Sequence, residues 1–161
     1  MKKKNHQKTN AAMILDRLGI SYELVEYEVD EDHLGADHLA ATLGQPVEQV
    51  FKTLVLRGDR NGLFVCVIAG NEEVDLKKAA RVSGNKKAEM LPLKELLPST
   101  GYIRGGCTSI GMKKHYPTFF SQDMKNFDKV YVSAGQRGLQ LKVNPMDLAQ
   151  AAEASFCDLN L

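Results

Sequence analysis

A glycine-rich basic loop is the part of the sequence best suited to chemistry. The segment GYIRGGCTSIGMKK, residues 101–114, holds four glycines and three cations. Gly105 and Gly106 have no Cβ to cover the neighbouring backbone N–H groups, and free N–H groups in series bind phosphate or a developing oxyanion. Thr108 and Ser109 offer hydroxyls beside them. A tight structural turn explains the same residues, and the segment matches neither a P-loop nor a dinucleotide fingerprint.

Lys52 is a single cation in a predicted strand whose other residues are mostly apolar. It lies in VFKTLVL, residues 50–56, where Leu54 and Leu56 share its face under strand alternation. A lysine in that position must reach back to water, pair with an anion or meet a ligand. Two interpretations therefore stay open: snorkelling at a sheet edge, or a cation directed into a pocket for an anionic or polar substrate.

A second candidate segment, VSAGQRGLQL at residues 132–141, follows another predicted strand. Ser133, Gly135 and Arg137 can place a hydroxyl, a free amide and a guanidinium at the rim of a pocket. A plain β-turn with glycine at positive φ explains the pattern equally well. No G-x-S-x-G elbow surrounds Ser133, which argues against a serine hydrolase.

Other nucleophiles and bases have little support in the sequence. Cys107 lies beside cations, which favour a thiolate, but no oriented His or Asn partner can be identified for it. His33 and His38 lie in or beside an acidic segment, so we interpret them as surface residues rather than general bases. The three cysteines are too scattered for a disulfide framework or a zinc site. We therefore expect neither a metal nor a cofactor.

Charge is unevenly distributed along the chain, although the net charge is only +1. Residues 22–37 hold seven acids and no Lys or Arg, whereas residues 77–114 hold nine cations and two acids. Such a basic cluster suits phosphates, or it is only a solvated face. No apolar run approaches the ~18 residues of a membrane span, and the first residues lack the apolar core of a secretory signal. We expect a cytoplasmic protein with no membrane contact.

The elements that must position these residues alternate irregularly between strands and helices. Residues 50–70 predict two strands joined at GDRNG, an Asn-Gly hairpin turn. The second of these strands is apolar on both faces and should be central in its sheet. A second hairpin is predicted over residues 129–143. The remaining predicted elements are helices over 9–19, 36–44, 74–84, 92–98 (begun by Pro92 and closed by Pro98) and 144–153, and strands over 21–29 and 155–159.

This pattern predicts a mixed α/β (α+β) fold, in which helices pack outside one mixed, mostly antiparallel sheet. No linker, internal repeat or low-complexity segment divides the chain. We therefore predict a single domain over residues 1–161, with residues 1–8 as a flexible tail.

Three segments taken together, FKTLV, STGYIRGGCTSIGMKK and VYVSAGQRGLQL, resemble the YbaK family of aminoacyl-tRNA deacylases in their order and spacing. DLKKAARVSGNKKAEM fits as well, and the resemblance runs from about Thr9 to Leu159. It implies a partial β-barrel surrounded by helices, related to the editing domain of bacterial prolyl-tRNA synthetases. It also implies trans editing, the removal of cysteine from Cys-tRNA(Pro) and, less discriminately, from Cys-tRNA(Cys).

The resemblance assigns roles to single residues. The family's essential lysine falls on Lys52 and its substrate-loop glycines fall on Gly105 and Gly106. Thr108 and Ser109 replace the family's usual Ser-Pro or Pro-Pro, which affects loop rigidity and amino-acid selectivity. The family uses no protein nucleophile; the substrate's own thiol attacks its ester carbonyl and expels the tRNA in a lyase-type step. The implied catalytic and substrate-binding residues are Lys52, Gly105, Tyr27, Gly106, Thr108, Ser109, Ser133, Gly135 and Arg137.

On this hypothesis the basic stretch binds acceptor-stem phosphates, and prolyl-tRNA synthetase is a candidate partner. Three alternatives stay open. The first is a water-dependent deacylase for another mischarged tRNA, such as Ala-tRNA(Pro). The second is a non-catalytic module that binds tRNA or a synthetase, and the third is a regulatory protein with a small-molecule pocket. The predicted tRNA-binding residues are Lys77, Lys78, Arg81, Lys86, Lys87, Arg104, Lys113 and Lys114.

Overall fold

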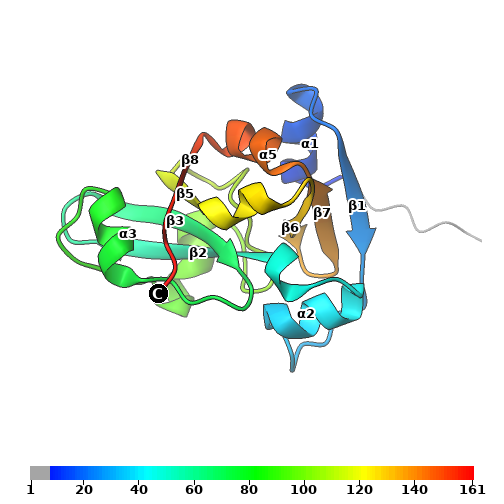
Figure 1. Cartoon of the computed structure of the whole chain (residues 1–161), viewed down its shortest axis with the longest axis horizontal. Helices are drawn as coiled ribbons and strands as arrows, with labels where there is room; N and C mark the ends of the chain where they lie inside the picture. The colour runs from blue at the N-terminus through cyan, green and yellow to red at the C-terminus, as the bar shows by residue number, and fades with distance from the viewer. Residues whose placement is uncertain (1–7) are drawn as a thin grey trace, which may run out of the picture.

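The fold consists of two β-sheets with helices around them, described here for residues 8–161 of a computed structural model. The three-stranded sheet has the order β1-β7-β6, and the five-stranded sheet has the order β4-β2-β3-β5-β8. Figure 1 shows the two sheets side by side along the long axis of the molecule. The strands are β1 Tyr22–Glu26, β2 Phe51–Gly58, β3 Gly62–Ala69, β4 Ala88–Met90, β5 Thr118–Ser121, β6 Val130–Gln136, β7 Leu139–Val143 and β8 Ala154–Cys157.

The two predicted hairpins are confirmed. β2 and β3 pair antiparallel with Leu54 opposite Cys66, and the turn between them contains Gly62 at φ 75°. β6 and β7 pair antiparallel with Ser133 opposite Gln140. β3 lies in the middle of its sheet, as its two apolar faces predicted, and β8 is an edge strand.

The prediction of one sheet is corrected by the structure. β5 and β8 run parallel to their neighbours, so the five-stranded sheet is mixed, whereas all pairs of the three-stranded sheet are antiparallel. A parallel bridge between Val50 and Tyr131 joins the two sheets. The described residues form no closed barrel, because the edges of the two sheets meet at this bridge without continuous pairing.

One apolar core lies between the sheets and fixes their relative position. It includes Val65 and Val67 of β3 together with Val132 of β6 and Leu141 of β7, all almost fully buried. Burying such side chains contributes about 1.5–3 kcal/mol each. The cavity described below lies where β2, β6 and β7 meet, so this shared core supports it from both sheets.

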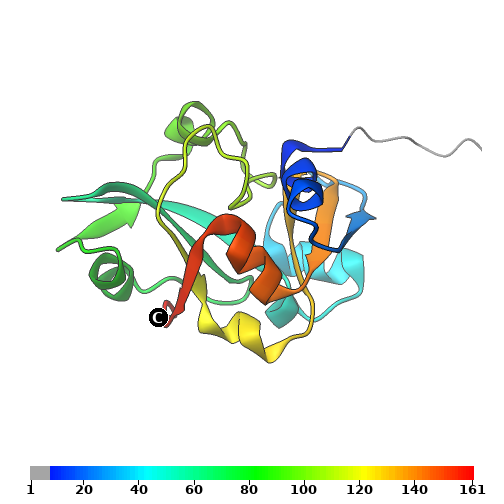
Figure 2. The same cartoon turned by 90° about the horizontal axis from the view of Figure 1, so that it is seen from above.

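Three of the helices begin at a residue whose side chain caps them. The Thr9, Asp75 and Asn144 side chains accept hydrogen bonds from the first free backbone N–H groups of their helices. Figures 1 and 2 place α2 and α3 at opposite ends of the long axis. The helices are α1 Asn10–Arg17, α2 Ala36–Leu43, α3 Leu76–Val82, α4 Leu93–Thr100 and α5 Pro145–Ala152, with 3-10 turns at Val47–Gln49 and Gln122–Asn126.

The end of α4 differs from its prediction. Pro98 lies inside the helix, which continues to Thr100. Only the hydrogen bond that the Pro98 nitrogen would make is lost. The next turn is retained because the Gly101 N–H donates to the Leu97 carbonyl at 2.8 Å, and Gly101 at φ 86° ends the helix in the left-handed region.

The predicted flexible tail, residues 1–8, lies outside the described residues except for Lys8. The Lys8 ammonium forms an ion pair with the Asp16 carboxylate at 2.7 Å on the surface of α1.

Candidate functional site

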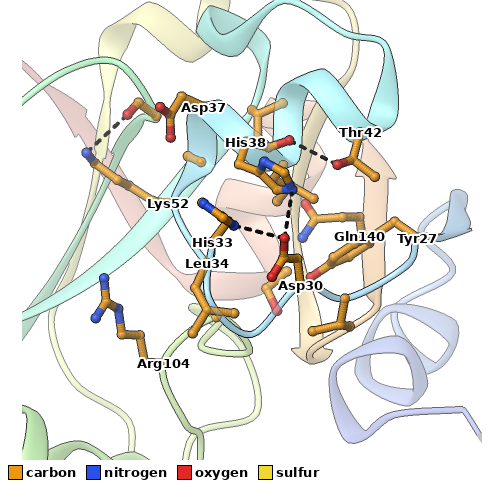
Figure 3. Close-up of a pocket in the computed structure, with 18 of the residues that line it drawn as sticks. Tyr27, Asp30, His33, Leu34, Asp37, His38, Thr42, Lys52, Arg104 and Gln140 are labelled. Carbon is orange, nitrogen blue, oxygen red and sulfur yellow. Dashed lines mark hydrogen bonds and ion pairs between the residues drawn. The ribbon is translucent and has the colours of Figure 1, made fainter.

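A cavity of about 410 Å³ brings together five of the predicted site residues, Tyr27, Lys52, Arg104, Gly105 and Ser133. Its walls come from four parts of the chain. These are the segment from the end of β1 into α2, the start of β2, the glycine-rich loop, and the facing strands β6 and β7. Figure 3 shows the side chains of these segments gathered around one space. The cavity is therefore built from residues far apart in the sequence.

Lys52 is the second residue of strand β2 and lines this cavity. Its Nζ donates to the Gly70 carbonyl at 3.2 Å. Gly70 also allows Ala36 of α2 to pack closely against it, because a Cβ on residue 70 would lie 2.4 Å from the Ala36 Cβ. Burial lowers the pKa of the Lys52 ammonium, while the charges of Glu73 and Asp37 act to raise it. An ammonium has three N–H donors and one is used, so Lys52 keeps donors that a ligand can accept from.

Gly105 is a glycine of the loop that lines the cavity. Its φ of 85° lies in the left-handed region that favours glycine, and its amide makes no hydrogen bond within residues 8–161. A Cβ at Gly105 would touch the Arg137 and Leu34 side chains at 3.3–3.4 Å. The position therefore favours a residue without a side chain, and its N–H is left available for a ligand.

Gly106 does not supply the second free amide that the sequence predicted. It is buried, and its N–H donates to the Ile103 carbonyl at 2.9 Å. A Cβ there would lie 3.0 Å from the Gln136 Cα and 3.1 Å from the Arg137 nitrogen. Gly106 thus allows the loop to pack against the β6–β7 backbone, and it does not line the cavity.

Arg137 and Gly135 lie outside the cavity, where Arg137 holds the loop and Gly135 contacts Ser133. The Arg137 Nε donates to the Arg104 carbonyl at 2.8 Å, which fixes the loop just before Gly105. The Gly135 N–H donates to the Ser133 Oγ at 3.1 Å, within a bulge that follows Ser133 in β6. Ser133 lines the cavity from inside the strand, not from its end as the sequence indicated.

Thr108 and Ser109 lie away from the cavity, which corrects their predicted contact with the substrate. Thr108 is fully buried and its Oγ1 has no hydrogen-bond partner. Ser109 lines a separate hollow of about 280 Å³, together with Lys114. The chain turns into the core after Cys107, because Ile110 is buried there, and this carries both hydroxyls away.

Cys107 lines the cavity as a neutral thiol. Burial raises its pKa to about 12, so the thiolate that a nucleophile needs is scarce near neutral pH. The interpretation of Cys107 as a wall residue agrees with this burial.

Gln140 is a cavity residue that the sequence reasoning missed. It is 2% exposed, and its Oε1 has no hydrogen-bond partner. Such an acceptor costs about 1–3 kcal/mol unless a donor satisfies it. A signal was present in the sequence, since Gln140 stands between Leu139 and Leu141 in a strand buried on both faces. A ligand donor in the cavity can satisfy this oxygen.

His33 and His38 are exposed, as the sequence predicted, but together with Asp30 they form a group at the cavity that was not predicted. All three line the cavity. Figure 3 shows His33 and His38 converging on the Asp30 carboxylate. Within residues 8–161, no cluster of His, Cys, Asp or Glu side chains is suited to hold a metal ion.

The basic stretch of the sequence divides into separate surface groups. Arg104 lies at the cavity, and Lys114 lies at the second hollow. α3 carries Lys77, Lys78 and Arg81 at the end of the molecule opposite α2, as Figures 1 and 2 show. The Lys78 ammonium is paired with Asp158 at 2.8 Å.

The remaining predicted tRNA contacts lie on turns. Lys86 and Lys87 are exposed, and their backbone N–H groups donate to the Asp59 carboxylate. The Lys113 Nζ approaches the Pro98 carbonyl at 3.5 Å. Binding of tRNA by these residues stays a prediction. Over residues 8–161 every helix is too short or too polar to span a bilayer.

Solved structures share this arrangement of sheets and helices. One, described as a "putative trans-editing enzyme for prolyl tRNA synthetase", aligns with a TM-score of 0.81 at 23% identity over 95% of this chain and 98% of its own. Another, "hypothetical protein APE2540", aligns with a TM-score of 0.83 at 21% identity over 91% and 96%. These likenesses show that the chain shares the fold of these proteins.

Sequence comparison identifies the family. The family model of the aminoacyl-tRNA editing domain matches residues 30–151, and the chain belongs to this family. A relative from Enterococcus faecalis, named "Putative Cys-tRNA(Pro)/Cys-tRNA(Cys) deacylase EbsC", is 45% identical over 98% of this chain and 96% of its own length. "Uncharacterized protein YwhH" of Bacillus subtilis is 27% identical over 76% of this chain and 78% of its own.

Proposed function

We propose that this protein is a trans-editing deacylase that releases cysteine from Cys-tRNA(Pro) and Cys-tRNA(Cys). Membership of the editing-domain family and the 45% identity to the E. faecalis relative support this class of substrate. The observation that carries the proposal is the cavity itself. One partly satisfied ammonium, Lys52, and one free amide, Gly105, line the same 410 Å³ space.

Ester cleavage develops negative charge on two oxygens, and the cavity offers a donor for each. The Gly105 N–H donates to the carbonyl oxygen as it becomes an oxyanion. Lys52 binds the leaving ribose oxygen or the terminal phosphate and fixes the 3′ end for reaction. The buried Gln140 Oε1 accepts a hydrogen bond from the α-ammonium of the esterified amino acid, which satisfies its missing partner.

The nucleophile in this proposal is the thiol of the bound cysteine. The sulfur attacks its own ester carbonyl carbon, and the bond from that carbon to the ribose oxygen breaks. The thiol proton passes to the ribose oxygen, so the products are a small cyclic thioester and a tRNA with a free hydroxyl. The cavity thiol of Cys107 does not compete, because burial keeps its pKa near 12. The step is formally of lyase type and its net result is deacylation.

Recognition of the tRNA body is proposed to rest on surface cations. Arg104 lies at the cavity and binds backbone phosphate near the 3′ end. The cavity contacts only the terminal nucleotide and its amino acid, so selection of the proline tRNA falls to groups outside it. Prolyl-tRNA synthetase is the proposed partner for that selection.

Single-turnover deacylation of Cys-tRNA(Pro), Cys-tRNA(Cys) and Ala-tRNA(Pro) by the full chain tests the proposal. We expect both cysteinyl substrates to be cleaved well above the rate without protein, and binding to weaken steeply with salt. Tight binding of tRNA without cleavage of either cysteinyl ester would favour a binding module and overturn the proposed function.

A further inference from the structure

A second hollow, of about 280 Å³, has no part in the proposed chemistry. Its walls come from α1, the end of the glycine-rich loop, the start of β5 and the end of α5. Figure 2 shows this loop reaching the side of α1. The hollow shares no lining residue with the cavity, so it is a separate place for a ligand.

The rim of the hollow is cationic. Arg17, in the last turn of α1, and Lys114 line it, and both residues are exposed. Within the described part of the chain neither forms an ion pair, and the neighbouring Asp16 carboxylate is bound by Lys8 and the Tyr22 hydroxyl. Neither Asp nor Glu lines the hollow, whereas three acids line the cavity. Unpaired cations in a hollow without carboxylates attract an anion such as a phosphate.

The buried part of the hollow, its floor, is apolar. Ile110 and Ala152 are buried there, and Met112 is half-buried. Tyr116 adds an aromatic ring, which its hydroxyl anchors by donating to the Ser99 carbonyl at 2.7 Å. Bases of any sequence can stack on an aromatic ring. An apolar floor and a cationic rim together match one nucleotide, with its base inside and its phosphate at the rim.

The wall that the loop contributes is fixed before a ligand binds. The Asn10 Nδ2 donates to the Gly111 carbonyl at 3.3 Å, and the Tyr102 hydroxyl donates to the Ile110 carbonyl at 2.7 Å. Gly111 adopts a φ of 78°, and a Cβ there would lie 2.7 Å from the Tyr102 Oη and 2.8 Å from the Asn10 Nδ2. These contacts hold the loop on α1, so little conformational freedom is lost on binding.

The same loop connects the hollow to the cavity. Gly105 lines the cavity and Ser109 lines the hollow. Four residues span at most about 14 Å, and a stacked nucleic-acid strand carries one phosphate about every 3.4 Å. A tRNA with its terminal nucleotide in the cavity can therefore reach the hollow within roughly four phosphates.

We propose that the hollow is a second nucleotide site for the substrate tRNA, which holds one nucleotide of the single-stranded 3′ end a few positions before the terminal adenosine. Arg17 and Lys114 bind its phosphate, the floor packs against its base, and the Ser109 hydroxyl is a further donor. The inference rests on the proposed function, because it needs the aminoacyl end of the same tRNA in the cavity. The added contact positions the strand and does not read the amino acid.

The test compares two substrates of different length, Cys-tRNA(Pro) and the cysteinyl ester of adenosine. Arg17→Gln/Lys114→Gln should raise the KM for Cys-tRNA(Pro) ~10-fold or more, the scale of lost hydrogen bonds to a charged group. Its kcat should change less than ~3-fold, because no group at the reacting atoms is altered. The small ester reaches only the cavity, so its kcat/KM should stay within ~3-fold of wild type.

Arg60→Gln/Lys94→Gln is the matched control, because it removes one exposed Arg and one exposed Lys that line neither space. Its KM for Cys-tRNA(Pro) should stay near that of wild type. Salt gives a second measurement: in Arg17→Gln/Lys114→Gln the slope of log(1/KM) against log salt concentration should be shallower by about 0.7, as for one lost phosphate contact to a single strand. The control should keep the wild-type slope.

Titration calorimetry with cytidine monophosphate and with inorganic phosphate distinguishes the tRNA from a free ligand. We expect no binding at micromolar concentrations, because a nucleotide tethered to the bound 3′ end needs little affinity of its own. Tight binding of either free ligand by wild type, lost in Arg17→Gln/Lys114→Gln while the KM for tRNA is unchanged, would assign the hollow to a free nucleotide or phosphate and overturn the proposal.

The remaining outcomes separate this inference from the proposed function. An unchanged KM for Cys-tRNA(Pro), an equal rise in KM in the control variant, or an equal loss on both substrates would overturn the second nucleotide site and leave the deacylase intact. Failure of wild type to cleave either cysteinyl substrate would overturn both proposals.

Discussion

The cavity has two walls whose polar groups are satisfied in different ways. The strand wall consists of Lys52, Ser133 and Gln140, and the acidic wall consists of residues 27–30 and 33–38. On the strand wall, Gln140 is 2% and Ser133 is 8% exposed, and the Gln140 oxygen has no partner. On the acidic wall, Asp30 and His33 are paired with each other and remain in contact with water.

The difference indicates that the two walls interact differently with a ligand. Buried polar groups without a full set of hydrogen bonds are stabilised most by a ligand. The ligand adds hydrogen bonds there without displacing bonds to water. Groups that are paired and solvated gain less from the ligand. We therefore propose that binding and charge stabilisation fall to the strand wall.

Removing the strand-wall ammonium should have the largest effect. Lys52→Ala deletes the cation beside the leaving oxygen, and we expect deacylation of Cys-tRNA(Pro) to fall by ~10²–10³-fold, the scale of losing one transition-state donor. Single-turnover rates measure this, and circular dichroism should show an unchanged fold. Lys142→Ala is the matched control, since Lys142 is a partly exposed strand lysine outside the cavity, and its activity should stay near wild type. If Lys52→Ala deacylated Cys-tRNA(Pro) at the wild-type rate, the ammonium of the strand wall would have no role in the reaction.

Local signals in the sequence predicted most of the scaffold and part of this wall. The Asn-Gly turn at Gly62 and the capping residue Asn144 each act within a few residues of the chain. The β2–β3 hairpin and helix α5 could therefore be predicted. The strands at Ala88–Met90 and Thr118–Ser121 were missed, because strands of three or four residues exist only through their distant partners. The division into two sheets depends on the same long-range pairing.

The candidate site shows the same contrast between local sequence signals and long-range packing. Lys52, Gly105 and Ser133 could be identified because each is chemically unusual in its own segment. The burial of Thr108 could not, since it follows from how the loop after Cys107 packs into the core. The contact between Asp30 and His33 was hidden among seven acids of residues 22–37, where the sequence gives no sign of which side chains meet.

A substitution at Gln140 should separate binding from stability on the strand wall. Gln140→Met keeps the length of the side chain and removes the unsatisfied oxygen. We expect the free energy of unfolding to rise by about 1 kcal/mol. The KM for Cys-tRNA(Pro) should rise ~10-fold or more, as for a lost hydrogen bond to a charged group. Denaturant unfolding and steady-state kinetics measure the two effects.

Gln122→Met, at an exposed glutamine of the 3-10 turn after β5, is the control for Gln140→Met and should change neither quantity. A lower stability of Gln140→Met with an unchanged KM would mean that Gln140 serves the fold, and the strand wall would then lose its proposed contact with the α-ammonium.

The smallest effect is expected at Cys107, which lies in the cavity but is proposed to belong to neither wall's chemistry. Burial raises the pKa of its thiol to about 12, so no thiolate titrates near neutral pH. Cys107→Ser should therefore keep Cys-tRNA(Pro) deacylation within ~3-fold of wild type. It should leave the pH profile unchanged between pH ~6 and ~9, well below that pKa. Cys107→Ala separates chemistry from the cost of burying a hydroxyl, because it removes the sulfur without adding a polar group. A loss of ~100-fold in both variants, with folding intact, would instead place a protein nucleophile between the two walls and replace the substrate-thiol mechanism.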